Sequence, residues 1–492
     1  MPPQIIRDLA ETSGYWAAVW TMCPMPDLHV ICDAPVGCFN LVGTAVPDYT
    51  DSIPHIENLT PSVITEQEVG GKGTTETVKW TYEGLRDTGK LAGKQLIVVS
   101  TAESEMIGAD LSDLVKQLQP GTTFYYSNSL AEDEWAGRDR VLRWLWEQYG
   151  KSADSEIQPE PGTVNIIGPT YGCFNAPSDL SEVRRLIEGA GGRINLIYPY
   201  EANLADTPRL AAAQINVVMY KEFGAGLATD LGQPTLTAPF GMRETVTFVR
   251  QVGQLLGTVD QAEAFIANEK KTTLQAVWDL WRGPQSDWFP TTNVGIVAGH
   301  SYADGLQRLL GEEMGMQIDF VSARPRRTDD LDNEGIRNRI HERAPAFVFG
   351  SINERIYLRE ANARYTNFIP AAFPGAAVRR AVGTPFMGFR GAVYITQEIV
   401  NRLYDALFSF LPVDGAYAQQ TNAPAGPAQG NMPWQTEAKQ RLDVVLEKLP
   451  YIPRISASRQ LQMTIEMLAN QRGVTEVTPE LVEEALAQNA PQ

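Results

Sequence analysis

Two cysteines of this chain stand in the same tetrapeptide, Gly-Cys-Phe-Asn, and each copy follows an apolar run and a proline. The first copy is Gly37–Asn40 and the second is Gly172–Asn175. Backbone amides at a helix start stabilise a thiolate, so a cysteine placed there can serve as a metal ligand. A buried structural thiol is the ordinary role of a lone cysteine. Cys38 is the stronger candidate ligand, because it follows the end of a predicted strand after the residues Pro-Val-Gly.

The remaining metal-binding residue types do not complete a site in this chain. Cys23, Cys32 and Cys38 match neither the paired spacing of zinc sites nor the tight runs of ferredoxins. The four histidines fall in unrelated segments, with none at i, i+4. A cubane iron–sulfur cluster needs four ligands, so one thiolate per chain can serve only if a partner chain supplies the others.

Nucleotide and nucleophile motifs are absent or incomplete. The stretch Gly84–Leu91 (GLRDTGKL) has the glycines and lysine of a P-loop, but Leu91 stands where Ser or Thr must hold magnesium. It also follows a helical pattern and precedes a strand, the reverse of the required order. We therefore expect no ATP site in this chain. There is no G-x-S-x-G elbow and no G-x-G-x-x-G after a strand. His300, in a strand-end loop, is either an acid or a residue that binds nearby backbone.

Composition sets further limits. The chain has 492 residues, more than the about 250–300 that one core supports, so several domains are expected. Its formal net charge of −18 provides no basic surface for nucleic acid. We expect no signal peptide, no membrane span and a cytoplasmic location with reduced cysteines, because no long apolar run is present.

Near-continuous apolar runs alternate with helical patterns, which predicts an α/β protein with parallel sheets. Eight runs are typical of strands: Leu28–Asp33, Gln95–Thr101, Thr163–Pro169, Ile194–Pro199, Ile215–Tyr220, Asn293–Gly299, Met316–Ala323 and Ala346–Ser351. Ligands of open parallel sheets bind beyond the carboxyl ends of the strands. Both tetrapeptides and His300 are predicted to lie there.

The strands and helices divide into three Rossmann-like domains, followed by a linker and a helical region. The predicted limits are 14–155, 162–285, 291–412, 413–433 and 434–492. The linker is rich in Ala, Gly, Pro and Gln. The segment Phe368–Pro412 combines phenylalanines with many glycines and alanines. It is either core or the wall of a flat apolar pocket.

Several stretches together resemble the catalytic subunits of nitrogenase-like reductases, and most closely the Z subunits of reductases that act on chlorophyllide a in bacteriochlorophyll biosynthesis. They are Ser13–Trp20, Asp33–Leu41, Ser100–Leu111, Val164–Gly189, Phe349–Leu358, Phe373–Ala392 and Arg454–Leu461. Each is modest alone, but they span nearly the whole chain in the family's order.

The resemblance implies three Rossmann-like domains and a heterotetramer with a Y subunit. It implies a [4Fe–4S] cluster between the two subunits, with three cysteines from Y and one from this chain, at Cys38. Thr101, Ala102 and Glu103 occupy the place where the cluster-rich sister subunit would have a cysteine. An ATP-hydrolysing iron protein, the X subunit, would dock transiently and bind the ATP.

The implied reaction is the two-electron reduction of the C7=C8 bond of chlorophyllide a. The B subunit of the related protochlorophyllide reductases has a histidine in the segment that corresponds to Phe368–Ala377, and this chain has none there. The difference favours chlorophyllide over protochlorophyllide as the substrate. Asp287, in a turn-like loop, is a candidate proton donor or simply a turn residue. Phe39, after the cluster cysteine, departs from the expected small polar or acidic residue. Protochlorophyllide reduction and a non-catalytic cluster-assembly scaffold remain alternatives.

Overall fold

The computed structural model describes most of the chain. The described residues are 12–45, 56–151, 157–282, 284–363, 365–373, 383–410 and 432–446, and 461–488 apart from 463, 467 and 470. Contacts divide the chain into two compact units. The first contains residues 1–278, 294–313 and 318–395, and the second contains 279–293, 314–317 and 396–492.

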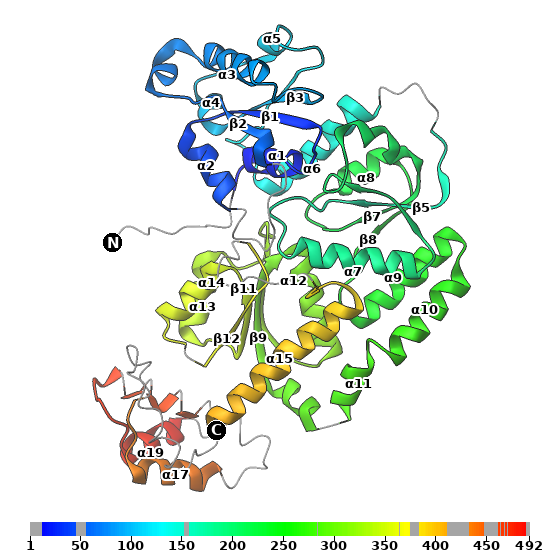
Figure 1. Cartoon of the computed structure of the whole chain (residues 1–492). Helices are drawn as coiled ribbons and strands as arrows, with labels where there is room; N and C mark the ends of the chain where they lie inside the picture. Colours follow the sequence, from blue (N-terminus) through cyan, green and yellow to red (C-terminus); the bar gives the residue numbers. More distant parts are fainter. Residues whose placement is uncertain are drawn as a thin grey trace. The chain divides into compact units, whose positions relative to one another are not determined.

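The first sheet has four parallel strands in the order β2-β1-β3-β4 (Figure 1). The strands are β1 Leu28–Asp33, β2 Leu59–Pro61, β3 Gln95–Ser100 and β4 Thr123–Tyr125. The helices are α1 Gly14–Met22, α2 Val36–Ala45, α3 Thr75–Asp87, α4 Ala102–Met106, α5 Ser112–Val115 and α6 Glu134–Leu145, with short turns η2 Ile56–Asn58, η3 Glu68–Lys72 and η4 Trp146–Gly150. Leucines and valines of α3 and α5 pack on β1 and β3, which explains the continuous apolar runs of those strands.

The second sheet has the order β6-β5-β7-β8, again parallel. Its strands are β5 Glu160–Ile167, β6 Arg193–Tyr198, β7 Ala213–Val218 and β8 Thr235–Thr237. Its helices are α7 Ala176–Gly189, α8 Ala225–Leu231, α9 Gly241–Leu256, α10 Val259–Lys271 and α11 Gln275–Trp281, with η5 Leu204–Ala212. Backbone N–H groups of Leu204 and Ala205 donate to the Asp27 carboxylate at 2.6 and 3.0 Å, which joins this domain to the first.

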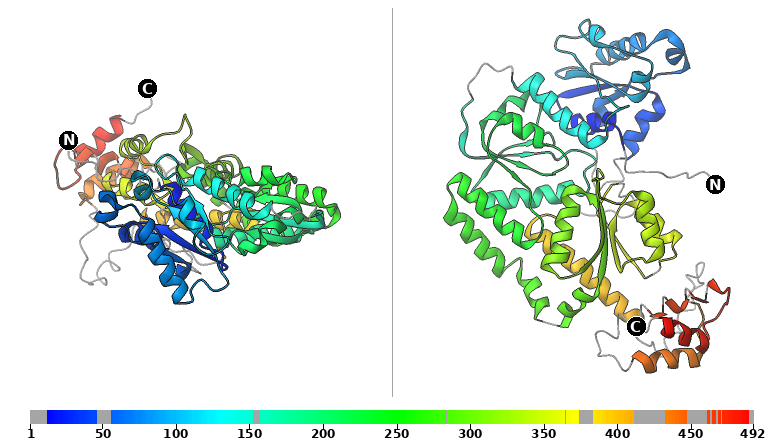
Figure 2. Two further views of the ribbon diagram at one scale, coloured as in Figure 1. Left: turned by 90° about the horizontal axis from the view of Figure 1, so that it is seen from above. Right: turned by 180° about the vertical axis from the view of Figure 1, so that it is seen from behind.

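The third sheet has the order β10-β9-β11-β12. Figure 2 shows this part of the chain, coloured green to yellow, from above and from behind. Its strands are β9 Asn293–Gly299, β10 Gln317–Arg324, β11 Phe347–Gly350 and β12 Asn367–Pro370. Its helices are α12 His300–Gln307, α13 Asn333–Glu342, α14 Ile352–Glu360 and α15 Gly388–Phe410, with η6 Pro284–Thr291 and η7 Arg308–Glu313. Isoleucines of α13 pack with Val297, Phe320 and Val348 on one face of the sheet.

The C-terminal residues form a separate apolar cluster within the second compact unit. Helices α17 Thr436–Leu446 and α19 Pro479–Gln488 contribute Leu442, Leu446 and Leu481 to it. Helix α19 begins with a proline, whose fixed φ suits a first helical position. Most of the predicted linker, and residues 447–460 of the predicted helical region, lie outside the described residues.

The predicted fold class is confirmed: the described part of the chain holds three parallel four-stranded sheets flanked by helices. The limits of the five predicted regions stay a prediction. Within the described residues, no helix combines the length and apolar character that a membrane crossing needs. The near-P-loop also has the element order that its sequence predicted, since Gly84 lies inside α3, before β3.

One buried histidine makes the stability of the first domain depend on pH. His29, in β1, is fully buried, and its Nε2 lies 3.1 Å from the Thr60 hydroxyl. Its Nδ1 has no hydrogen-bond partner. Burial, together with the positive charges of Lys94 and Lys90, lowers the pKa of His29 to about 4. The folded state therefore holds the neutral imidazole at pH values where the unfolded chain takes up a proton.

We predict that acidification from pH 7 to pH 4 destabilises the wild type more than a His29→Gln variant. Unfolded histidine protonates near its ordinary pKa of about 6.5, so the excess loss develops between about pH 6.5 and 4 and reaches roughly 2–3 kcal/mol. Urea unfolding at a series of pH values measures it. A Thr60→Val variant, which keeps the imidazole, should retain the wild-type pH dependence. Parallel profiles for wild type and His29→Gln would contradict the prediction.

Candidate functional site

Cys38 lies at the carboxyl edge of the first sheet, in the first turn of α2. Helix α2 begins at Val36, three residues after β1 ends at Asp33. The Cys38 side chain is half-buried, and its thiol donates a hydrogen bond to Glu103 Oε1 at 2.9 Å. The single cysteine predicted as a ligand is thus accessible from outside the sheet and meets a carboxylate.

Glu103 is held in place by the start of α4. Thr101 is the N-cap of this helix, and it exchanges hydrogen bonds with Ser104 in a capping box. The Thr101 hydroxyl also donates to the main-chain oxygen of Asp33 at 2.7 Å. The sequence pointed to this tripeptide as the place of a missing cysteine. It did not predict that the Glu103 carboxylate would contact Cys38.

Asp33 ties together the loops that surround Cys38. Its fully buried carboxylate accepts hydrogen bonds from Ser62 after β2, at 2.7 Å, and from Thr74 before α3, at 2.8 Å. Burial raises the pKa of Asp33 to about 6, against the opposing effect of the donors Ser62, Thr74 and Ser104. The segment between β2 and α3 is therefore fixed at both of its ends to one residue at the end of β1.

The environment of Cys38 favours the protonated thiol. Burial, the hydrogen bond to Glu103 and the negative charge of Glu103 together raise the pKa of Cys38 to about 11. The sequence led us to expect a thiolate stabilised by the helix start, and this part of the expectation is wrong for the chain alone. A carboxylate 2.9 Å from the sulfur outweighs the backbone amides of one helical turn.

The other three cysteines are not available beside Cys38. Cys23 and Cys32 are 2% and 0% exposed, and burial raises the pKa of both thiols. Cys173 belongs to the second domain and is 5% exposed. Among the described residues, no group of three or more His, Cys, Asp or Glu side chains is placed to hold a metal ion. Cys38 is therefore the one accessible thiol among the four cysteines of this chain.

The second tetrapeptide has a different structure from the first. Gly37–Asn40 lies within α2, whereas Gly172–Asn175 forms a turn before α7 in which Gly172 and Asn175 have positive φ angles of 75° and 58°. The Cys173 sulfur lies 3.4 Å from the Thr170 hydroxyl and 3.7 Å from a guanidinium nitrogen of the buried Arg138. The two copies therefore do not share one conformation, and a structural role for Cys173 stays a prediction.

Residues of this second turn and of α7 hold the segment before α15. Asn175 Nδ2 donates to the Thr384 carbonyl at 2.8 Å, and the Ser178 hydroxyl accepts from Gly383 N at 3.2 Å. The buried Asp179 carboxylate accepts from the backbone N–H groups of residues 386 and 387, at 2.7 and 3.1 Å, and from the Tyr302 hydroxyl. Phe386 and Phe389 are fully buried, so the core interpretation holds for these two phenylalanines.

The two remaining candidates are Asp287 and His300. Asp287 lies in η6 of the second compact unit and is exposed. Cys38 belongs to the first unit. His300 begins α12, with its Nε2 2.6 Å from the Pro325 carbonyl oxygen. That contact agrees with the backbone-binding role, and the role of Asp287 stays a prediction.

Residues 13–404 match the family model of nitrogenase component 1 type oxidoreductases. The chain belongs to this family. Its members generally bind iron–sulfur clusters and work as heterotetramers with partner subunits and an iron protein.

Curated relatives agree with this membership over nearly the whole length. The B subunit of the light-independent protochlorophyllide reductase of Gloeobacter violaceus is 24% identical over 93% of this chain and 94% of that protein. The same subunit of Chloroflexus aggregans is 25% identical over 76% of this chain and 72% of that protein. Among solved structures, nitrogenase Cp1 at pH 6.5 superposes with a TM-score of 0.68 at 14% identity, covering 84% of this chain and 96% of that one. This last likeness concerns the fold alone.

The residues around Cys38 fit one corner of a shared iron–sulfur cluster. An accessible thiol is present, its partner is a hydrogen-bonded carboxylate, and the other three cysteines are buried. A family member that binds a cluster with this site must take the other ligands from another chain.

Proposed function

We propose that this chain is the Z subunit of a chlorophyllide a reductase, which reduces the C7=C8 bond of the pigment by two electrons in an ATP-dependent reaction. The observation that carries the proposal is the single accessible Cys38 at the sheet edge of a nitrogenase component 1 type protein. Support also comes from the curated relatives, which act on a closely related tetrapyrrole.

In this proposal Cys38 supplies one ligand to a [4Fe–4S] cluster, and a Y-type partner subunit supplies three. When bound, the cluster would deliver electrons one at a time. The chain's own contribution is to hold the sulfur at the sheet edge, where Asp33 and Thr101 fix the flanking loops. The thiol proton must leave before the sulfur can bind iron. Because Glu103 favours the thiol, the isolated chain is poorly prepared to bind metal alone.

Exposed apolar side chains beside Cys38 support a protein partner at this edge. Val36 and Leu41 on α2 are 45% and 58% exposed, and Met106, one turn after Glu103, is 74% exposed. Val63, next to the Ser62 that binds Asp33, is 43% exposed. Large apolar side chains gathered around one polar site are typical of a surface that another protein covers. A covering subunit would also shield a cluster from water.

Two further parts of the proposal concern ATP and substrate. The absence of a complete P-loop supports an ATPase on a separate iron protein, the X subunit. The absence of a histidine in the segment Phe368–Ala377 supports chlorophyllide as the pigment, although residues 374–377 lie outside the described residues. Protochlorophyllide reduction is the second candidate, and the names of the curated relatives favour it.

We predict that Cys38→Ala abolishes cluster binding in the complex with the Y-type partner. The partner would keep three ligands, and the fourth iron would lose its protein sulfur. Iron content and the EPR signal of the reduced, anaerobically purified complex measure the loss. Cys173→Ala, which changes the other copy of the tetrapeptide, is the matched control and should keep both. An unaltered EPR signal and full activity in Cys38→Ala would contradict the ligand role.

We predict that the complete system consumes chlorophyllide a and leaves protochlorophyllide unchanged. The anaerobic assay contains both catalytic subunits, the iron protein, ATP and one pigment, and it follows the absorption spectrum over time. Loss of the chlorophyllide band with appearance of a bacteriochlorin band is the expected result. Turnover of protochlorophyllide alone would establish the second candidate instead. Turnover of neither pigment by a cluster-loaded complex would refute both.

We predict that Asp287→Asn slows pigment turnover at least about tenfold without loss of the cluster, because an amide cannot donate the proton that a carboxylic acid can. The matched control is Asp279→Asn, a change of another aspartate in the same compact unit. An unchanged kcat and pH profile for Asp287→Asn would leave this residue with the role of a turn residue.

A further inference from the structure

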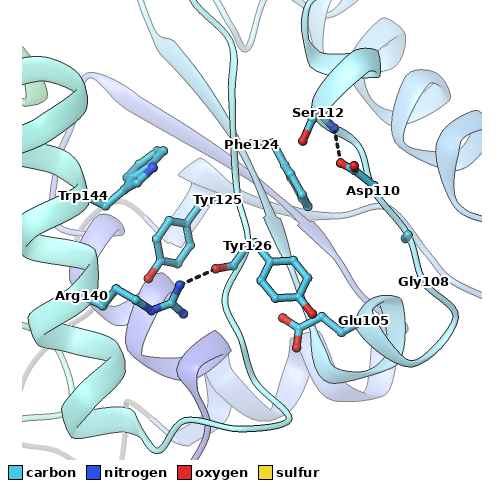
Figure 3. Close-up of a pocket in the computed structure, with 10 residues that line it drawn as sticks. Glu105, Gly108, Asp110, Ser112, Phe124, Tyr125, Tyr126, Arg140 and Trp144 are labelled. Atoms are coloured by element: carbon cyan, nitrogen blue, oxygen red, sulfur yellow. Dashed lines mark hydrogen bonds between the residues drawn. The ribbon is translucent and has the colours of Figure 1, made fainter.

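A cavity of about 530 Å³ lies beside β4 (Figure 3). Its walls come from β4 and the residue after it, from the segment between α4 and α5, and from α6. The lining residues are Glu105, Gly108, Ala109, Asp110, Ser112, Phe124, Tyr125, Tyr126, Arg140 and Trp144. Three of them are consecutive residues of one strand end, so the cavity follows the strand.

The cavity coincides with the open edge of the first sheet. Strand β4 is last in the order β2-β1-β3-β4, and it pairs with β3 through the register Ile97↔Thr123 to Val99↔Tyr125. In a parallel ladder, alternate residues turn both backbone groups toward one neighbour. At least one residue of Thr123–Tyr125 therefore presents its N–H and C=O outward, where the described part of the chain places no further strand.

Side chains from the two faces of the strand line opposite sides of the cavity. Successive residues of a strand point to opposite faces of its sheet. Figure 3 shows Tyr125 with Arg140 and Trp144 on one side of this segment, and Phe124 and Tyr126 with Asp110 and Ser112 on the other. The cavity thus extends along both sides of the β4 backbone. An extended polypeptide beside the edge would send alternate side chains to the two sides.

The side formed by α6 offers hydrogen-bond donors. Arg140 donates to Glu132 Oε2 at 2.7 Å, to the Tyr126 carbonyl at 2.8 Å and to the Ser127 carbonyl. A guanidinium has five N–H groups, so two of those of Arg140 make none of these hydrogen bonds. The Tyr125 hydroxyl is buried without a hydrogen-bond partner among the described residues, and Tyr125 is 2% exposed. This side suits a carboxylate or another acceptor.

The opposite side is acidic. Asp110 Oδ1 accepts the Ser112 N–H at 2.9 Å, and Asp110 is exposed. Glu105 accepts from the Ser100 and Ser127 hydroxyls at 2.7 and 2.9 Å. This side suits a basic residue. The cavity as a whole therefore suits an extended segment in which an acidic and a basic residue are adjacent, with apolar neighbours for the aromatic rings.

We propose that an extended segment of the Y-type partner subunit adds to the first sheet as a fifth strand along β4. This inference rests on the proposed function for the identity of the partner. The proposal is supported by the continuity between the β4 edge and the surface around Cys38. Leu130 N donates to Glu105, and the exposed side chains of Leu130 and Met106 lie between the two areas. Backbone hydrogen bonds at a sheet edge provide affinity, and the side-chain pockets provide selectivity.

Charge disfavours a second copy of this chain as the occupant. Antiparallel pairing of two β4 edges about a twofold axis perpendicular to the sheet would bring equivalent faces together. Arg140 would then face Arg140, and Asp110 would face Asp110, which is unfavourable. A small molecule would leave the side chains on one side of the β4 edge, or the outward backbone groups, without hydrogen-bond partners. A segment from a different chain satisfies both sides and the backbone.

Hydrogen exchange of the isolated chain and of the complex with its Y-type partner tests the proposal. We expect the amides of Thr123–Tyr125 to exchange at least about tenfold more slowly in the complex. The matched control is β8, Thr235–Thr237, a three-residue edge strand of the second sheet that should not change. Asp110→Lys should weaken assembly about tenfold, whereas Asp113→Lys, at an exposed neighbour outside the cavity, should not.

Each alternative outcome is decisive. A cluster-loaded complex in which β4 exchanges as in the isolated chain would overturn this inference and leave the proposed function standing. Slower exchange that depends on the concentration of the isolated chain would indicate self-pairing, and slower exchange on adding chlorophyllide alone would indicate a small-molecule site; either result would overturn it. Failure to form any cluster-containing complex would refute the proposed function itself.

Discussion

The carboxylate of Asp33 is the fixed point on which the site depends. Parallel strands end at the same edge, so the segments after β1, β2 and β3 emerge side by side and need a common anchor. Asp33 supplies it, with side-chain hydrogen bonds to Ser62 and Thr74 and a main-chain hydrogen bond to Thr101. The main-chain oxygen of Asp33 holds Thr101 at the start of α4, the helix whose Glu103 lies 2.9 Å from the Cys38 sulfur. A buried charged group held by several donors loses much of its stabilising effect if any one donor is removed.

If Cys38 is the proposed cluster ligand, its surroundings oppose metal binding by the isolated chain. Burial and Glu103 raise the pKa of the Cys38 thiol, and one sulfur is too few for a cluster. In the proposed complex, both obstacles are removed at the same time, because the partner brings three thiolates and an iron takes the place of the proton. Loading would then depend on assembly, which protects the isolated chain from binding stray metal ions. The exposed apolar side chains around the same edge provide the driving force for that assembly.

Eight strands could be predicted from sequence because their buried, near-continuous apolar runs leave few alternatives. β1 and β9 have the predicted limits, and the other six are shifted by at most three residues at either end. The four strands that escaped prediction are β2, β4, β8 and β12. Each has only three or four residues and lies at a sheet edge, where one neighbour suffices and no long apolar run is required. β4 shows the consequence, because the cavity along its edge would have been overlooked from sequence.

For the site, too, the sequence predicted local positions and missed what depends on the arrangement of the strands. Cys38 could be placed at a strand end because its position relative to β1 is local. Its contact with Glu103 joins residues 65 positions apart. That contact depends on the strand order β1-β3, which the apolar pattern does not encode. The repeated tetrapeptide misled for a related reason: four identical residues do not determine a conformation, since the first copy continues into a helix and the second has two residues with positive φ.

The second copy of the tetrapeptide has other surroundings, because its cysteine is buried. Cys173 is enclosed by Thr170 and the buried Arg138, and the turn that follows directs Asn175 and Asp179 toward residues 384–387. Asp179 thereby satisfies backbone N–H groups just before α15 that would otherwise be buried without partners. Both strand ends thus use a buried aspartate to fix neighbouring segments. At the first, the segments hold an accessible thiol at the surface; at the second, they fasten the aromatic residues that begin α15. The difference between the two cysteines lies in these surroundings and not in the tetrapeptide they share.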